Sequence, residues 1–184
     1  QSNYDTLVFA VRNIEIVKIP NFIEIIGKYA FNSCQLIQKI DISENTKLRI
    51  IDKFAFYGCT SINHIKIPLH LTSIEEGAFF SCDILRSVEI PINSELRTIG
   101  KDAFNDTIIE SISIPDNLVE LKKEWCTDIR HLNRIEVSPN NPIYSSYEDM
   151  FIIGKSSSEN DNYDVLVLCI RNILNMPKFL ILLK

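Results

Sequence analysis

A nine-residue pattern that recurs along the chain constrains its fold more than any other feature. Isoleucine begins the pattern, Ala-Phe follows at its fifth and sixth places, and cysteine ends it, at residues 26–34, 51–59, 74–82 and 99–107, with Thr107 replacing the last cysteine. Successive phenylalanines are 25, 23 and 25 residues apart. Repeats of about 20 to 50 residues are typical of solenoids, in which each coil buries its apolar side against its neighbours.

Each copy is followed by a segment in which apolar and polar residues alternate, a pattern that predicts a half-buried strand. These segments are residues 39–42, 64–67, 87–90, 111–114 and 134–137. An earlier segment, residues 17–19, precedes the first copy, and most of the six are followed by a proline. Proline ends a strand because it has no N–H to donate. Equivalent strands would pair along one face, and the Ala-Phe segments would form a turn or short helix opposite. The predicted fold class is therefore mostly β with short helical turns, as a solenoid with a parallel sheet on one face.

We expect residues 1–184 to form a single solenoid. Regular repeats occupy about residues 15–140, with a degenerate copy in which Trp125-Cys126 stands in place of Ala-Phe. An irregular β unit with an exposed loop is expected at about 141–175, and a further repeat would start at 176–184.

Two further features refine this organisation. Residues 4–14 match residues 163–173 at an offset of 159. The strands expected at 151–153 and 165–169 would pair as a hairpin. Two-residue insertions are predicted to bulge from one edge of the solenoid; they lie in segments 43–48 and 92–96.

Charge and composition exclude several functions. The net charge is −5 and the longest basic cluster is Lys122-Lys123, so the chain lacks the basic surface of a nucleic-acid-binding protein. No run of about 18 apolar residues occurs, so no membrane insertion is predicted. Residues 1–4 contain neither a start methionine nor a signal peptide, and we expect an internal fragment of a longer protein.

The cysteines favour packing over chemistry. Cys34, Cys59 and Cys82 occupy the same place in three repeats, which would suit a metal site, a disulfide ladder or a column of buried thiols. Zinc sites use closely spaced cysteine pairs, whereas these cysteines are 25 and 23 residues apart. Thr107 fills the same place in the fourth repeat, and threonine serves neither a zinc site nor a disulfide. We therefore expect buried thiols and no metal.

No arrangement of catalytic residues can be recognised. His64, His70 and His131 are far apart in the sequence, and a catalytic triad requires its members to converge in space. No glycine-rich phosphate-binding loop is present. We expect neither an enzyme nor a cofactor.

The outward positions of the predicted strands are the best candidate for a partner-binding surface. They carry charges of both signs and no aromatic anchor. A solvated sheet face without a partner would explain the same residues. The candidate residues are Lys18, Lys39, Asp41, His64, Lys66, Ser87, Glu89, Ser111, Ser113, Arg134 and Glu136. Separately, Asn105-Asp106-Thr107 is an N-glycosylation sequon, so Asn105 is a possible glycosylation site in a secreted protein.

The combined pattern I-G-x-x-A-F-x-x-C-x-x-L-x-x-I-x-I-P resembles the BspA-like leucine-rich repeats. Ile99–Phe104, Ala78–Cys82 and Val88–Pro91 carry it most cleanly. Asn140–Tyr144 is similar to an irregular unit that interrupts the repeats of that family. The resemblance directly covers about residues 15–144 and implies a leucine-rich-repeat solenoid. Thr107, Trp125-Cys126 and the serines at 43 and 138 depart from the pattern.

The resemblance also implies a function. Many members are surface or secreted proteins of host-associated bacteria and protist parasites and are implicated in adhesion. We therefore expect a non-catalytic protein-binding or adhesion module of a larger cell-surface or secreted protein. Its partners would be host cell-surface or matrix proteins, or another microbial surface protein. An architectural spacer and an intracellular repeat scaffold remain as alternatives.

Overall fold

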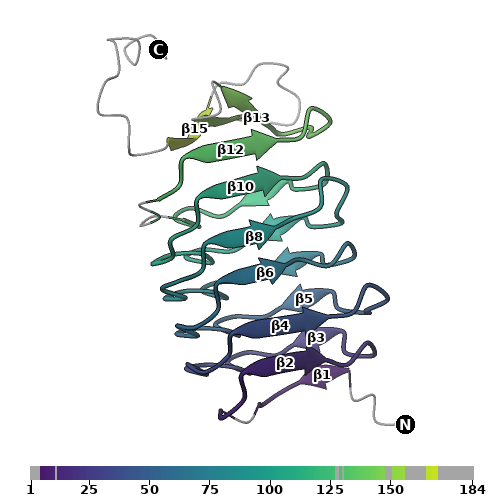
Figure 1. Ribbon diagram of the computed structural model, residues 1–184. Coiled ribbons are helices and arrows are strands. Elements are labelled where there is room, and N and C mark those ends of the chain that lie inside the picture. Colours follow the sequence, from purple (N-terminus) through teal and green to yellow (C-terminus); the bar gives the residue numbers. More distant parts are fainter. Residues whose placement is uncertain are drawn as a thin grey trace.

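The chain winds into a column of stacked coils (Figure 1). The computed structural model describes residues 5–10, 12–126, 129, 131–147 and 151–155, and the backbone of 165–169. Each regular coil contributes one strand to each of two faces.

The longer strands lie on the face that was predicted from the alternating segments. They are β2 (Ile16–Ile19), β4 (Lys39–Ile42), β6 (His64–Lys66), β8 (Ser87–Glu89), β10 (Ser111–Ile114) and β12 (Arg134–Val137). All their pairings are parallel, within β2–β4 and within β6–β8–β10–β12. Apart from Ile16, which is exposed at the start of β2, their apolar residues point inward and their polar residues outward, which confirms the predicted parallel sheet.

A second parallel sheet was not predicted. It contains the two-residue strands β1 (Thr6–Leu7), β3 (Ile25–Ile26), β5 (Ile50–Ile51), β7 (Ser73–Ile74), β9 (Thr98–Ile99) and β11 (Glu120–Leu121), in that order. It lies behind the longer strands in Figure 1. Its inward isoleucines are those that begin the nine-residue pattern. Two residues are too few to show an alternating signature, so periodicity alone could not reveal these strands.

A stack of phenylalanines forms the centre of the core. Phe31, Phe56, Phe79 and Phe104 are each at most 1% exposed. Their successive ring centroids are 4.9, 5.2 and 5.6 Å apart, with nearly parallel planes. Stacked coils thus share one continuous apolar interior, as the repeat predicted.

The degenerate copy keeps the same register. The N–H of Phe79 donates to the carbonyl of Ala103, and the N–H of Phe104 donates equivalently to the carbonyl of Trp125. Trp125-Cys126 therefore occupies the place of Ala-Phe, as predicted, and both side chains are buried.

The Ala-Phe segments form turns, and the described residues contain no helix. Each turn bonds alternately to its own coil and to the next. Thus Phe31 N–H donates to Ala55 O at 2.8 Å, whereas Cys34 N–H donates to Phe31 O at 3.1 Å. This path requires left-handed backbone before alanine and again before cysteine. The residues with positive φ are Tyr29, Ser33, Phe54, Gly58, Gly77, Ser81, Asp102, Asp106 and Glu124.

The cysteine column is buried, as predicted. The Sγ of Cys59 donates to Phe31 O at 3.1 Å, and the Sγ of Cys82 donates to Phe56 O at 3.3 Å. Burial raises the pKa of Cys59 to about 12 and raises that of Cys82 as well. Thr107 instead donates to Phe104 O within its own coil, at 2.8 Å. These thiols pack and bond in their protonated form. The side chain of Cys169 lies outside the described residues.

The two-residue insertions lie in loops along one edge, but a hydroxyl group anchors each loop to the body. Thr46 and Ser94 are buried, and their hydroxyls accept hydrogen bonds from the N–H groups of Leu48 and Leu96. A side-chain hydroxyl that bonds to the backbone two residues ahead closes a compact turn. The loops are therefore tied inward rather than simply protruding.

The regular coils end in an antiparallel sheet of β13 (Tyr144–Tyr147), β14 (Phe151–Gly154) and β15 (Val165–Cys169). The predicted pairing of β14 with β15 is confirmed. The further repeat predicted at 176–184 and most of the predicted exposed loop lie outside the described residues.

Asn141 and Tyr144 attach this unit to the preceding coil. The Asn141 amide donates to Pro115 O and Leu118 O, and its Oδ1 accepts from the N–H groups of Ile143 and Tyr144. The Tyr144 hydroxyl accepts from Leu121 N–H at 3.0 Å. The buried side-chain amide of Asn141, with both its nitrogen and its oxygen hydrogen-bonded, thus fixes the start of the irregular unit to the preceding coil.

Candidate partner-binding surfaces

The outward residues of the longer strands form ordered rows, which we call the strand face. His64, Ser87, Ser111 and Arg134 are in register across β6, β8, β10 and β12. Parallel strands lie about 4.8 Å apart, so each row presents a side chain at that interval. Ten of the eleven predicted residues are exposed, and Ser113 is half-buried. The structure therefore places all the predicted residues on one side of the solenoid.

Most of the charge on the strand face lies on β2 and β4 and in a second row of in-register residues, which contains Lys66, Glu89, Ser113 and Glu136. Lys66 is in register with Glu89, and their charged atoms are 4.0 Å apart. On β12, Arg134 Nη2 forms an ion pair with Glu136 Oε1 at 2.5 Å.

At the N-terminal end, Lys18 is in register with Asp41. Within the described part of the chain, neither Lys18 nor Lys39 makes an ion pair. The N-terminal strands therefore carry the cations most available to a partner.

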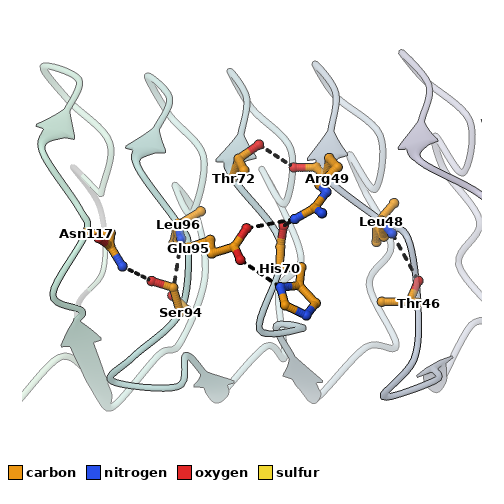
Figure 2. Close-up of polar contacts among 9 residues, drawn as sticks. All are labelled: Thr46, Leu48, Arg49, His70, Thr72, Ser94, Glu95, Leu96 and Asn117. Carbon is orange, nitrogen blue, oxygen red and sulfur yellow. Dashed lines mark hydrogen bonds and ion pairs between the residues drawn. The ribbon is translucent and has the colours of Figure 1, made fainter.

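The edge formed by the inserted loops contains a polar cluster that the sequence did not reveal. Figure 2 shows Arg49, His70 and Glu95 meeting from three successive loops. Arg49 Nη1 donates to Glu95 Oε2 at 2.7 Å and to His70 O at 2.9 Å, and His70 Nδ1 is 2.8 Å from Glu95 Oε1. The hydrogen bond from His70 and the nearby Arg49 charge hold the pKa of Glu95 below its ordinary value. The three residues belong to different repeats, so sequence spacing gave no signal for the cluster.

Four aromatic side chains gather on the face of the turns, and we call them the aromatic patch. Tyr29 stacks on Phe54 at 5.3 Å, Tyr57 stacks on Phe80 at 5.5 Å, and Phe54 meets Tyr57 edge-on at 6.0 Å. Tyr29 is exposed and the others are half-buried. Sequence reasoning missed this patch because it considered exposed aromatics only on the strand face. Their recurring place beside Ala-Phe was the available signal.

Asn105 lies on the same side of the coils as the aromatic patch. It is half-buried, and its amide is 3.4 Å from Asp102 Oδ1. The Thr107 of its sequon is buried. Glycosylation of Asn105 remains a prediction.

The described residues contain no group of three or more His, Cys, Asp or Glu side chains placed to hold a metal ion. They also include no helix with the length and apolarity needed to cross a bilayer.

Stacked coils, a parallel sheet along one side and a phenylalanine interior define a leucine-rich-repeat solenoid. Residues 5–133 match the BspA type leucine rich repeat region in six copies. The chain therefore belongs to this family, as its sequence pattern suggested. Comparison with curated protein sequences returned no match.

Solved structures with the same architecture include a vaccine antigen and a protein described as a cell surface protein. The pneumococcal vaccine antigen PcpA superposes with a TM-score of 0.71 over 77% of this chain and 34% of its own, at 22% identity. A leucine-rich repeat protein from Bacteroides ovatus gives 0.60 over 66% and 33%, at 27% identity. A leucine rich cell surface protein from Faecalibacterium prausnitzii gives 0.59 over 77% and 43%, at 22% identity. The chain thus spans about a third of the first two proteins.

Proposed function

We propose that this chain is a non-catalytic protein-binding module that engages its partner through the strand face. The observation that carries the proposal is the arrangement of polar side chains in exposed, in-register rows on a continuous solenoid. Solenoids use such extended faces for binding because many weak contacts can form at once. A partner protein with an extended polar surface would fit this geometry better than a small molecule would.

The rigidity of the core supports this role. Behind the strand face, the inward isoleucines pack in a core centred on the phenylalanine stack. A surface that is already ordered loses little conformational freedom when a partner binds, and this preserves affinity. The mixture of charges favours selectivity, because a partner must match both signs along the rows.

The setting we propose is a larger surface or secreted repeat protein with an adhesive role. One similar solved structure is described as a cell surface protein and another as a vaccine antigen. The expected partners are host cell-surface or matrix proteins, or a surface protein of another microbe.

The test is a charge reversal on the strand face. Lys39→Glu with Lys66→Glu should weaken binding to purified matrix proteins or intact epithelial cells about tenfold, because electrostatic complementarity is lost at two strands. Surface plasmon resonance and cell-binding assays would measure the change. Lys47→Glu with Lys123→Glu changes the net charge equally outside the strand face and should leave binding intact.

A turn-face variant completes the design. Tyr29→Ser with Phe80→Ser removes one ring from each stacked pair of the aromatic patch and should also leave binding intact. If the strand-face variant binds normally while the turn-face variant does not, the module binds through the opposite side and the assignment of the strand face is wrong.

A second candidate is an architectural spacer, which the unbroken phenylalanine stack favours. A spacer would bind neither the purified matrix proteins nor the epithelial cells at any concentration, and the strand-face and control variants would behave alike. That result would refute the binding role.

A further inference from the structure

The segment that contains β1 and the segment that contains β15 have closely similar sequences. Tyr4–Ile14 and Tyr163–Ile173 are identical at seven of eleven positions, at an offset of 159. This match places β1 and the three residues after it, Thr6–Ala10, in correspondence with β15, Val165–Cys169. The strand that pairs with β15 therefore indicates which kind of strand could pair with β1.

β15 pairs antiparallel with β14, which comes from the irregular unit. Phe151, Ile152, Ile153 and Gly154 are in register with residues 169, 168, 166 and 165, respectively. Subtracting 159 from each transfers this register to Ala10, Phe9, Leu7 and Thr6. A strand with the sequence of β14 would thus match the first coil on either side of one register shift, which lies between Ile152 and Ile153 and skips residue 167, the counterpart of Val8.

The corresponding edge of β1 is open among the described residues. β1 pairs only with β3, through bonds such as Ile25 N–H to Asp5 O at 3.0 Å and Gly27 N–H to Leu7 O at 2.8 Å. Peptide groups alternate sides along a strand, and the carbonyls of Asp5 and Leu7 face β3, so the N–H and C=O of Thr6 point away from β3. An unpaired strand edge of this kind is a template for another strand.

The side chains at this edge support the same conclusion. Val8 is 72% exposed and Phe9 is 71% exposed, the highest values among the large apolar residues that the structure describes. At the opposite end, Phe151 and Ile152 of β14 are buried. The solenoid therefore covers its C-terminal coil with the antiparallel unit and leaves apolar surface at its first coil.

We propose that the β1 edge is a docking site for an antiparallel strand of the β14 type, supplied by the irregular unit of a preceding 159-residue module. Modules of this kind would join end to end, and each irregular unit would link one set of coils to the next. The proposal is independent of which face binds a partner protein.

A tandem chain tests the proposal. Residues 1–162 are joined directly to residues 4–184, so that the second copy of Thr6–Ala10 follows the first irregular unit as β15 does. The peptide that spans this junction has a unique mass. Its amides at Thr6–Ala10 should exchange with deuterium about tenfold more slowly than those of the first coil of the single chain, because they enter a ladder.

The matched control replaces residues 141–162 of the first copy with a Gly-Ser linker of equal length. It removes the β14 strand, and the second copy of Thr6–Ala10 should exchange as fast as in the single chain. A further tandem, lengthened by glycine and serine after residue 158, relieves any strain at the connection and should keep the protection. Equal exchange in the direct tandem, the lengthened tandem and the linker control would overturn the proposal.

Discussion

At the residue scale, the coil depends on a backbone conformation more than on a particular side chain. Nine described residues have positive φ, and only Gly58 and Gly77 among them are glycine. A left-handed conformation costs most residues roughly 1–2 kcal/mol, so the remaining positions are strained. The alternating bonds to the same and the next coil stabilise this path. Gly77 has an added role, because a Cβ there would lie 2.3 Å from the Phe54 ring.

The phenylalanine stack gives a prediction at this scale. Phe79→Ala should destabilise the protein by about 3–5 kcal/mol, because it removes a fully buried ring between two others. Urea unfolding followed by circular dichroism would measure the loss. Phe80→Ala, which truncates the adjacent half-buried ring of the aromatic patch, should cost clearly less. Similar losses for the two variants would contradict the assignment of Phe79 to the centre of the core.

At the element scale, the sequence identified the strands that have room to alternate. Segments such as Ser111–Ile114 repeat apolar and polar residues over four positions, and the structure contains the corresponding strand. The two-residue strands of the second sheet have no such signature, because tertiary pairing with neighbouring coils creates them. Tyr144 shows the same limit: its hydroxyl takes the place of a backbone partner at the end of that sheet, and no local pattern encodes this contact.

The Tyr144 contact can be tested directly. Tyr144→Phe should destabilise the protein by about 1 kcal/mol, because the Leu121 N–H loses its acceptor. Hydrogen exchange at Leu121 should accelerate, and the urea midpoint should fall. Tyr147→Phe removes the hydroxyl of an exposed tyrosine of the same strand and is the matched control. Unchanged exchange at Leu121 would show that the hydroxyl does not secure the sheet edge.

At the scale of the whole molecule, the strand face was predicted from the sequence and the other surfaces were not. Alternation fixes which side of a strand faces water, so all the predicted outward residues lie on one side. The Arg49–His70–Glu95 cluster assembles across coils from charged and polar residues that are ordinary on a surface. The aromatic patch also assembles across coils, and the recurrence of its members beside Ala-Phe was the signal for it in the sequence. The identity of a partner depends on that partner's own surface, which no pattern in this chain specifies.

The Arg49–His70–Glu95 cluster links three coils and predicts how the free energy of unfolding depends on pH in acid. The pKa of Glu95 is lowered in the folded protein, chiefly by the hydrogen bond from His70. The unfolded chain therefore binds this proton at higher pH, and the stabilisation is present above the ordinary glutamate pKa and lost as pH falls through the lowered value. Glu95→Gln should make the decline in unfolding free energy below about pH 4.5 shallower.

Urea titrations at a series of pH values would measure this slope. Glu44→Gln is the control, since Glu44 is exposed on the loop that carries Arg49 and joins none of the ion pairs among the described residues. An equal change of slope in the two variants would show that the cluster contributes nothing particular.

The anchored loops have a consequence for how the protein tolerates rearrangement. Thr46 and Ser94 belong to alternate coils, and the intervening coil has a shorter loop with Leu71 at the equivalent place. Phe31 and Phe79 are 48 residues apart, as are Phe56 and Phe104, although single spacings differ. The unit that can be removed or inserted without disturbing the loops is thus a pair of coils. Excising the intervening coil alone would set two long loops side by side and remove His70 from between Arg49 and Glu95, whereas excising two successive coils would keep the alternation of long and short loops.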